Sequence, residues 1–174
     1  HALDGANGPV WRVIHDAAPE IAKDQTFDWG HYDRIDRYDW DNDGNFNEPD
    51  GYVDHVMIVH AGVGQEEDGG AQGDDAIWSH RGRANYQPQL GNVQAVGPEK
   101  YVKRGGIQVD AAHDLWVLDY TMMPENGAPG VFSHEFGHDL GLPDLYDTEP
   151  QNNSDSSVAF WSIMSQGSWA SLEN

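Results

Sequence analysis

The segment from Val131 to Asp144 contains residue types that bind a metal and move a proton. His134 and His138 stand four positions apart, with Glu135 beside the first histidine. Four residues make slightly more than one helical turn, so both imidazoles leave one helix face about 6 Å apart along the axis. That separation suits two nitrogens bound to one Zn²⁺, and Glu135 is offset so that it can hold a zinc-bound water. The spacing predicts a hydrolytic zinc site.

The residues after this pattern extend it. Gly141 permits a sharp turn, and Asp144 follows as a candidate third zinc ligand. Further along, Ser-Ile-Met164-Ser is typical of a methionine turn, where Met164 is an apolar floor because a thioether is a weak zinc ligand. Two alternatives for Asp144 stay open. It could cap or brace the turn, or Asp147 could replace it as the ligand.

The zinc ligands and the glutamate indicate a mechanism. Three protein ligands leave a fourth zinc position for water, which is typical of a catalytic site. Glu135 would take a proton as this water attacks a carbonyl and then pass the proton to the departing amine. As alternatives, His134 and His138 could be helix-surface residues, and Glu135 could only support the ligands.

A second pattern, from Asp39 to Asp50, repeats the spacing of a calcium-binding loop. The candidate ligands are the carboxylates of Asp39, Asp41, Asp43 and Asp50 and the backbone carbonyl of Asn45. Gly44 permits the tight reversal, but the last position is Asp rather than Glu and a strand follows, so we expect a structural calcium loop without an EF-hand fold. An Asp/Asn turn that binds only water is the alternative. Asp54 and Glu66–Asp68 are further acidic candidates.

Composition limits the class of protein. The chain has 174 residues, no cysteine and a net charge of −21. Such a charge repels phosphates and anionic lipids, so we expect neither nucleic-acid nor membrane partners. Because the chain starts at His1 without an initiator Met, we expect an excised piece, shortened at both ends. We predict that residues 1–174 form one α+β domain.

Hydrophobic periodicity predicts few regular elements. We expect a helix from about Val10 that ends or kinks near Pro19, a polar structured loop over 24–51, and an active-site helix from Val131. The expected strands are Tyr52–His60, buried on both faces, a short one at Gln94–Val96, and Ile107–Val109 with Leu115–Met122, paired across a turn at Ala111–Asp114.

Together these motifs resemble the immune inhibitor A family of secreted bacterial metallopeptidases, a metzincin-like group. The matching stretches are Asp43–His55, His60–Gln65, Ala76–His80, Asp119–Thr121, Pro124–Gly127, Gly130–Asp147 and Phe160–Trp169. The resemblance implies a twisted mixed sheet with a backing helix and an active-site helix, and a Met-turn beneath the zinc. It also implies zinc ligands at His134 and His138, a general base at Glu135, and calcium in the Asp-rich region. Finally, it implies that Leu115–Met122 is the edge strand that pairs with a peptide substrate.

We therefore expect a secreted, extracellular bacterial zinc endopeptidase that cleaves protein substrates and is stabilised by Ca²⁺. One alternative is a catalytically silent, calcium-binding adhesive or structural module that retains a zinc site. Another is a zinc hydrolase that acts on something other than a peptide.

Overall fold

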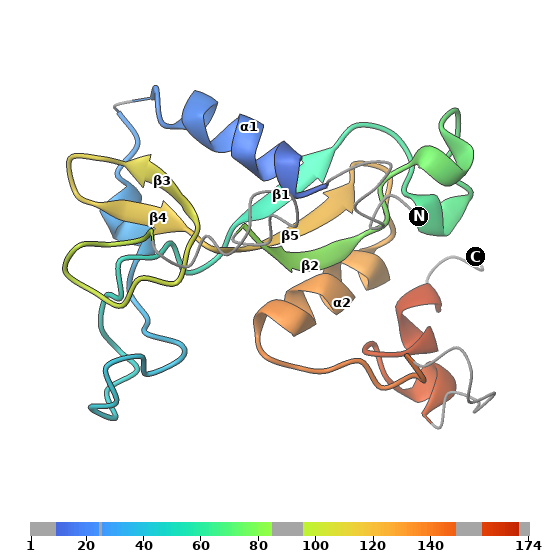
Figure 1. The fold of residues 1–174 in the computed structure, drawn as a ribbon. Coiled ribbons are helices and arrows are strands. Elements are labelled where there is room, and N and C mark those ends of the chain that lie inside the picture. The colour runs from blue at the N-terminus through green and yellow to red at the C-terminus, as the bar shows by residue number, and fades with distance from the viewer. Residues whose placement is uncertain (1–9, 25, 85–95, 149–157, 171–174) are drawn as a thin grey trace. The chain divides into compact units, whose positions relative to one another are not determined.

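The computed structural model describes residues 10–24, 26–84, 96–148 and 158–170 (Figure 1). Its helices and strands are α1 (Trp11–Ile21), β1 (Met57–His60), β2 (His80–Arg83), β3 (Ile107–Asp110), β4 (Leu115–Val117), β5 (Asp119–Pro124) and α2 (Pro129–Asp139). The chain divides into two compact units. We call Met57–Arg81 with the chain from Thr121 onward the zinc-motif unit, and the chain up to Val56 with Gly82–Tyr120 the Asp-rich unit. This composition confirms the predicted α+β class.

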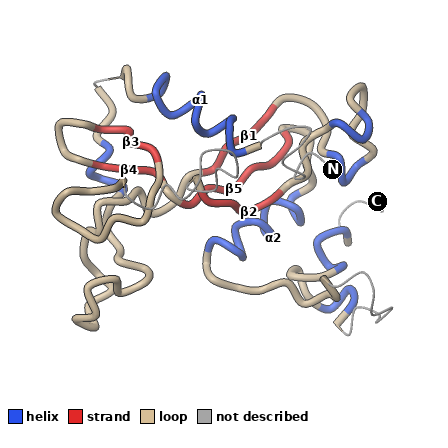
Figure 2. The backbone as a smooth tube through the Cα atoms, in the orientation of Figure 1, coloured by secondary structure: helices blue, strands red, loops and turns tan. Residues whose placement is uncertain are grey.

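The Asp-rich unit packs α1 against a two-stranded sheet. Strands β3 and β4 pair antiparallel, with Ile107 opposite Val117, as predicted from the turn between them. Helix α1 contacts β3 through one apolar face, on which Val10, Ile14 and Ala18 recur every four residues and are buried. Figure 2 shows that loops and turns make up most of the chain between α1 and β1.

Helix α1 runs two residues past Pro19 and ends at Ile21, which agrees with the predicted end near this proline. Proline removes one N–H donor and disturbs the preceding turn, but Pro19 lies only two residues before the end of the helix. The last turn is closed around it, because the Ala22 N–H donates to the Ala18 carbonyl at 2.9 Å and the Lys23 N–H to the Glu20 carbonyl at 3.2 Å.

The zinc-motif unit is built on a three-stranded sheet in the order β1-β5-β2. Strand β1 runs parallel to β5, from Met57 opposite Thr121 to His60 opposite Pro124. Every residue of β5 is buried, as expected of a central strand. Helix α2 follows β5 and starts with Pro129 in its first turn, where the missing N–H costs nothing.

One strand prediction is wrong in its details, and another is not tested. The strand predicted over Tyr52–His60 is regular only from Met57, and it lies at an edge of its sheet rather than buried on both faces. Met57 and Val59 share the exposed face, with 46% and 51% of their surface accessible. Tyr52 forms an isolated bridge with Trp116 instead. The strand predicted at Gln94–Val96 lies outside the described residues, apart from Val96.

The segment Leu115–Met122 is not an edge strand, so that prediction is also wrong. It divides into β4 and β5, and β5 lies between β1 and β2. Strand β4 pairs with β3 on one side, and on the other Trp116 exchanges backbone hydrogen bonds with Gly51 and Val53 at 3.0 and 2.9 Å. Among the described residues, the edge strands on either side of β5 are β1 and β2.

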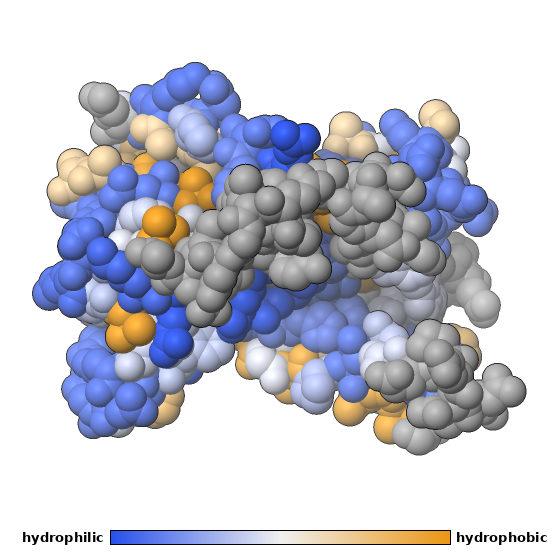
Figure 3. Space-filling view, viewed as in Figure 1, coloured by the Kyte–Doolittle hydropathy of each residue, from blue (hydrophilic) through white to orange (hydrophobic). Residues whose placement is uncertain are grey.

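Exposed apolar side chains follow α2 in the zinc-motif unit. Figure 3 shows hydrophobic residues on the surface in the region of this helix and of the chain that follows it. The most exposed large apolar residues there are Leu140, Leu142, Phe160 and Trp161. No helix among the described residues combines the length and apolarity needed to cross a bilayer.

Candidate metal centre

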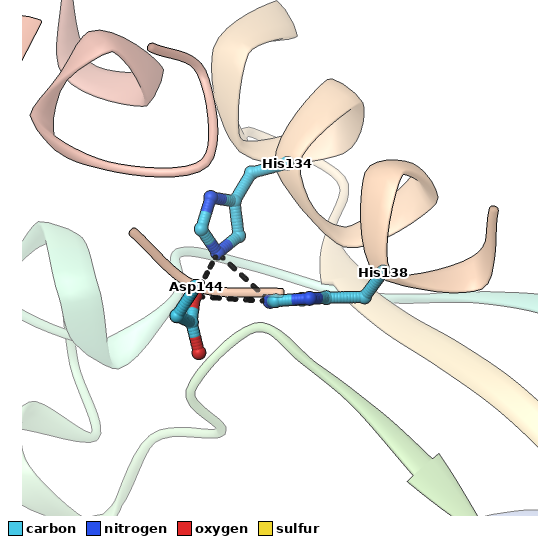
Figure 4. A group of neighbouring side chains, drawn as sticks. All are labelled: His134, His138 and Asp144. Atoms are coloured by element: carbon cyan, nitrogen blue, oxygen red, sulfur yellow. Dashed lines mark hydrogen bonds and ion pairs between the residues drawn. The ribbon is translucent and has the colours of Figure 1, made fainter. Parts of the chain in front are cut away.

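Helix α2 and the turn after it bring the three predicted zinc ligands together (Figure 4). The Nε2 atoms of His134 and His138 lie 3.1 Å apart. Asp144 Oδ1 lies 3.2 Å from His134 Nε2 and 3.1 Å from His138 Nε2. Gly141 supplies the reversal that returns Asp144 to the helix, with φ of 90°, a conformation that glycine adopts without strain.

Backbone carbonyls orient both imidazoles. His134 Nδ1 lies 2.8 Å from the Ile163 carbonyl, and His138 Nδ1 lies 2.8 Å from the Leu142 carbonyl. A carbonyl only accepts, so each Nδ1 carries the proton and donates it. With the proton on Nδ1, each ring can offer its Nε2 lone pair to the centre of the group, as a metal ligand requires.

The donor set fits zinc. Two Nε2 atoms and a carboxylate oxygen face one another, and Asp144 Oδ1 is buried without a hydrogen-bond partner. Tetrahedral zinc with bonds of about 2.0–2.1 Å places its ligand atoms about 3.3 Å apart, close to the observed 3.1–3.2 Å. Asp144, and not Asp147, belongs to this group.

Glu135 is buried beside the group and is not part of it. Only 5% of its surface is accessible, and its Oε2 has no hydrogen-bond partner. Burial raises the pKa of Glu135 to about 8, with contributions from the charges of Asp144 and Glu66, while a hydrogen bond from the Arg81 backbone N–H opposes the shift. A carboxyl in such surroundings readily exchanges a proton near neutral pH.

Tyr146 is a member of the site that the spacing argument missed. Its ring lies nearly parallel to that of His134, with centroids 6.3 Å apart. Its hydroxyl is hydrogen-bonded to Asp144, and burial together with the Asp144 charge raises the pKa of Tyr146 to about 12. Its position two residues after a ligand was the only sequence signal, whereas nothing in the sequence pointed to the carbonyls of Ile163 and Leu142.

Met164 packs directly beneath α2. It is 3% exposed, and a β-carbon at Gly137 would lie 2.5 Å from its Sδ. The neighbouring Ile163 holds His134 through its carbonyl. The methionine segment therefore supports the metal group by packing and by one hydrogen bond.

The Asp-rich loop brings three of its five predicted calcium ligands together. Carboxylate oxygens of Asp39, Asp41 and Asp43 lie within 4.8 Å of one another. The Gly44 N–H donates to Asp39 at 3.0 Å, and the Asn45 N–H donates to Asp43 at 2.7 Å. Asp41 also belongs to an alternative group, with Asp36 and Glu48.

Asp50 lies apart from these three carboxylates, among buried acids. It is 6% exposed, and its backbone N–H donates to Asp33 at 3.0 Å. Burial raises the pKa of Asp50 to about 7, and the charges of Asp33, Asp36 and Asp54 add to the shift. The structure therefore separates Asp50 from the loop pattern that predicted it as a ligand.

Comparison with known proteins gives one consistent result. The family model described as "Immune inhibitor A peptidase M6, catalytic domain" matches residues 4–173. "Immune inhibitor A" from Bacillus thuringiensis subsp. alesti is 45% identical over 98% of this chain and 23% of its own length. "Pre-pro-metalloprotease PrtV" from Vibrio cholerae serotype O1 is 44% identical over 91% of this chain and 16% of its own length. The chain thus spans less than a quarter of these relatives.

Proposed function

Because this chain belongs to the immune inhibitor A family of M6 metallopeptidases, we propose that it is a zinc endopeptidase domain that hydrolyses protein substrates outside the bacterial cell. One observation carries the proposal: three metal donors converge within 3.2 Å beside a buried, unpaired glutamate oxygen. We further propose that residues 1–174 form one catalytic domain with a metzincin-like fold, in which Met164 is the Met-turn residue.

Each residue of the site has a role in peptide hydrolysis. His134, His138 and Asp144 would hold zinc, which when bound acidifies water and polarises a carbonyl. Glu135 accepts a proton from the attacking water and donates it to the departing amine. Its burial and raised pKa support this role, because it can hold the proton between the two transfers.

The substrate would lie along the edge strand β2 rather than along Leu115–Met122. His80 and Arg81 lie on that edge strand, and the Arg81 N–H reaches Glu135. A peptide extended along β2 by main-chain hydrogen bonds would pass the metal group, using backbone groups other than the Ser79 and Arg81 N–H, which donate to Glu66 and Glu135. This placement favours peptides over other substrates.

Calcium would stabilise the Asp-rich loop. We propose Asp39, Asp41 and Asp43 as ligands, since their carboxylates are close together and like charges at this spacing repel without a cation. Asn45 and Asp50 stay in the proposal as ligands from the loop pattern, with Asp50 dependent on a rearrangement of its buried surroundings.

Hydrolysis of casein by the zinc-loaded protein tests the function. We expect a chelator to abolish hydrolysis and zinc to restore it, and we expect no hydrolysis of ester or sugar substrates in a parallel panel. A protein that binds zinc but cleaves no peptide would instead support a catalytically silent calcium-binding module. Cleavage confined to the non-peptide substrates would identify a different hydrolase.

A further inference from the structure

Glu66 holds the residue that precedes the edge strand β2. Its Oε2 accepts the Ser79 backbone N–H at 3.0 Å, and its Oε1 accepts the Ser79 hydroxyl. Ser79 is 3% exposed, so water does not replace these two bonds readily. The carboxylate therefore binds both polar hydrogens of one buried residue.

The backbone around Glu66 leaves its carboxylate little freedom. A β-carbon at Gly64 would lie 2.5 Å from the Glu66 carboxylate carbon, so a larger residue there would displace the carboxylate. The Gln65 N–H donates to the Ile77 carbonyl at 3.0 Å, and the Gln65 side-chain amide donates to the Asp74 carbonyl at 2.9 Å. The turn is thus tied to the segment before β2 at more than one point.

The side of this segment that donates a hydrogen bond to Glu66 also faces the catalytic glutamate, Glu135. Alternate residues of an extended strand direct their N–H groups to the same side. Ser79 and Arg81 are two residues apart, and their N–H groups donate to Glu66 and Glu135 respectively. Two carboxylates from different parts of the chain therefore accept the N–H groups of alternate residues, one just before β2 and one within it, on the same side of the strand.

We propose that Glu66 is a positioning residue that fixes the start of β2, so that a peptide paired with this edge lies in register with Glu135 and the metal ligands. The inference rests on the proposed peptidase function. Loss of the two bonds to Ser79 lets the edge strand shift, and a shift of about 1 Å misplaces the scissile bond.

The test compares variants of the zinc-loaded enzyme on a long fluorogenic peptide. We expect Glu66→Ala to raise KM at least about tenfold, as loss of a buried charged hydrogen bond does, with a smaller change in kcat and unchanged zinc content. Glu66→Gln should restore KM to within about threefold, because the amide can accept from the Ser79 N–H and donate to its hydroxyl. Glu67→Ala, a neighbour in the same turn, is the matched control and should resemble the wild type.

The outcomes separate the two proposals. A wild type that hydrolyses peptides while Glu66→Ala keeps its KM would overturn only the role of Glu66. An equal rise in KM for Glu66→Gln and Glu66→Ala would also overturn the role of Glu66, since its charge rather than its hydrogen bonds to Ser79 would then matter. If Glu66→Ala fails to fold, Ser79→Ala decides: a raised KM with retained zinc supports the role, and an unchanged KM contradicts it. A wild type without peptide hydrolysis would contradict both proposals.

Discussion

Met164 Sδ packs against Gly137 so closely that a β-carbon on the glycine would lie 2.5 Å from the sulfur. Gly137 sits between the two ligand histidines on α2, and Met164 follows Ile163, whose carbonyl orients His134. This contact therefore couples the helix that carries the metal ligands to the segment that orients one of them.

Gly137→Ala should weaken both stability and zinc binding. Alanine favours a helix by about 1 kcal/mol, but overpacking a tight contact costs about 1–3 kcal/mol, so we expect a net loss of up to about 2 kcal/mol. Displacement of Met164 also moves the Ile163 carbonyl away from His134. Thermal unfolding and zinc titration measure the two effects. Ser133→Ala on the exposed face of α2 is the control, and a Gly137→Ala protein with unchanged zinc affinity would refute the coupling.

Asp144→Ala should abolish tight zinc binding. It removes an oxygen that lies 3.1–3.2 Å from both imidazole nitrogens. We expect zinc affinity to fall by more than the about 10–100-fold that loss of a supporting residue costs. Asp147→Ala is the matched control, because that carboxylate is outside the group. The assignment fails if Asp147→Ala, and not Asp144→Ala, loses zinc.

The buried acid Asp50 should make the calcium-free protein less stable as pH rises. Its pKa is about 7 in the folded protein against 3.8 for an unperturbed carboxyl. Between these values the folded carboxyl keeps a proton that the unfolded one has lost, so the free energy of unfolding decreases from about pH 4 to about pH 7. Urea unfolding in a chelator measures this slope.

Asp50→Asn is the variant that assigns the slope to this residue. The amide keeps an oxygen to accept the Tyr52 N–H, which Asp50 accepts at 2.9 Å, but it has no proton to lose. We expect a shallower slope rather than a flat one, because the pKa values of Asp33 and Asp54 are also raised by burial. An unchanged slope would show that Asp50 ionises normally in the folded protein.

Calcium should raise the melting temperature through the Asp-rich loop. A ligand at 100 times its Kd stabilises by about 2.7 kcal/mol. Asp41→Asn should abolish most of this gain, since Asp41 belongs to both carboxylate groups in the loop. Asp74→Asn, an exposed acid outside the loop, is the control for net charge. Equal calcium stabilisation in Asp41→Asn and the wild type would remove the loop as a site.

The sequence predicted the site correctly where the positions of the metal ligands depend only on neighbouring residues. The spacing of His134 and His138 determines their shared helix face, and Gly141 indicates the turn that returns Asp144. It failed where the answer depends on neighbours distant in the chain. The family resemblance implied that Leu115–Met122 is an edge strand, and periodicity could not show that β5 would lie between β1 and β2.

Two site residues show the same limit. The loop spacing placed Asp50 with Asp39, Asp41 and Asp43, but tertiary packing buries it beside Asp33. Conversely, Glu66 was predicted only as one of several further acidic candidates for a metal ligand. Its role depends on Ser79, which reaches it through a turn that spacing alone does not specify.

The most direct test of the proposed mechanism is the hydrolysis rate of Glu135→Gln together with its zinc content. Glutamine keeps the size of the side chain and removes its ability to accept the proton, so kcat should fall by about 10²–10⁴-fold. His134, His138 and Asp144 are untouched, so one zinc should remain bound for each protein molecule. A Glu135→Gln protein that retains zinc and cleaves peptides at the wild-type rate would contradict the proposed mechanism.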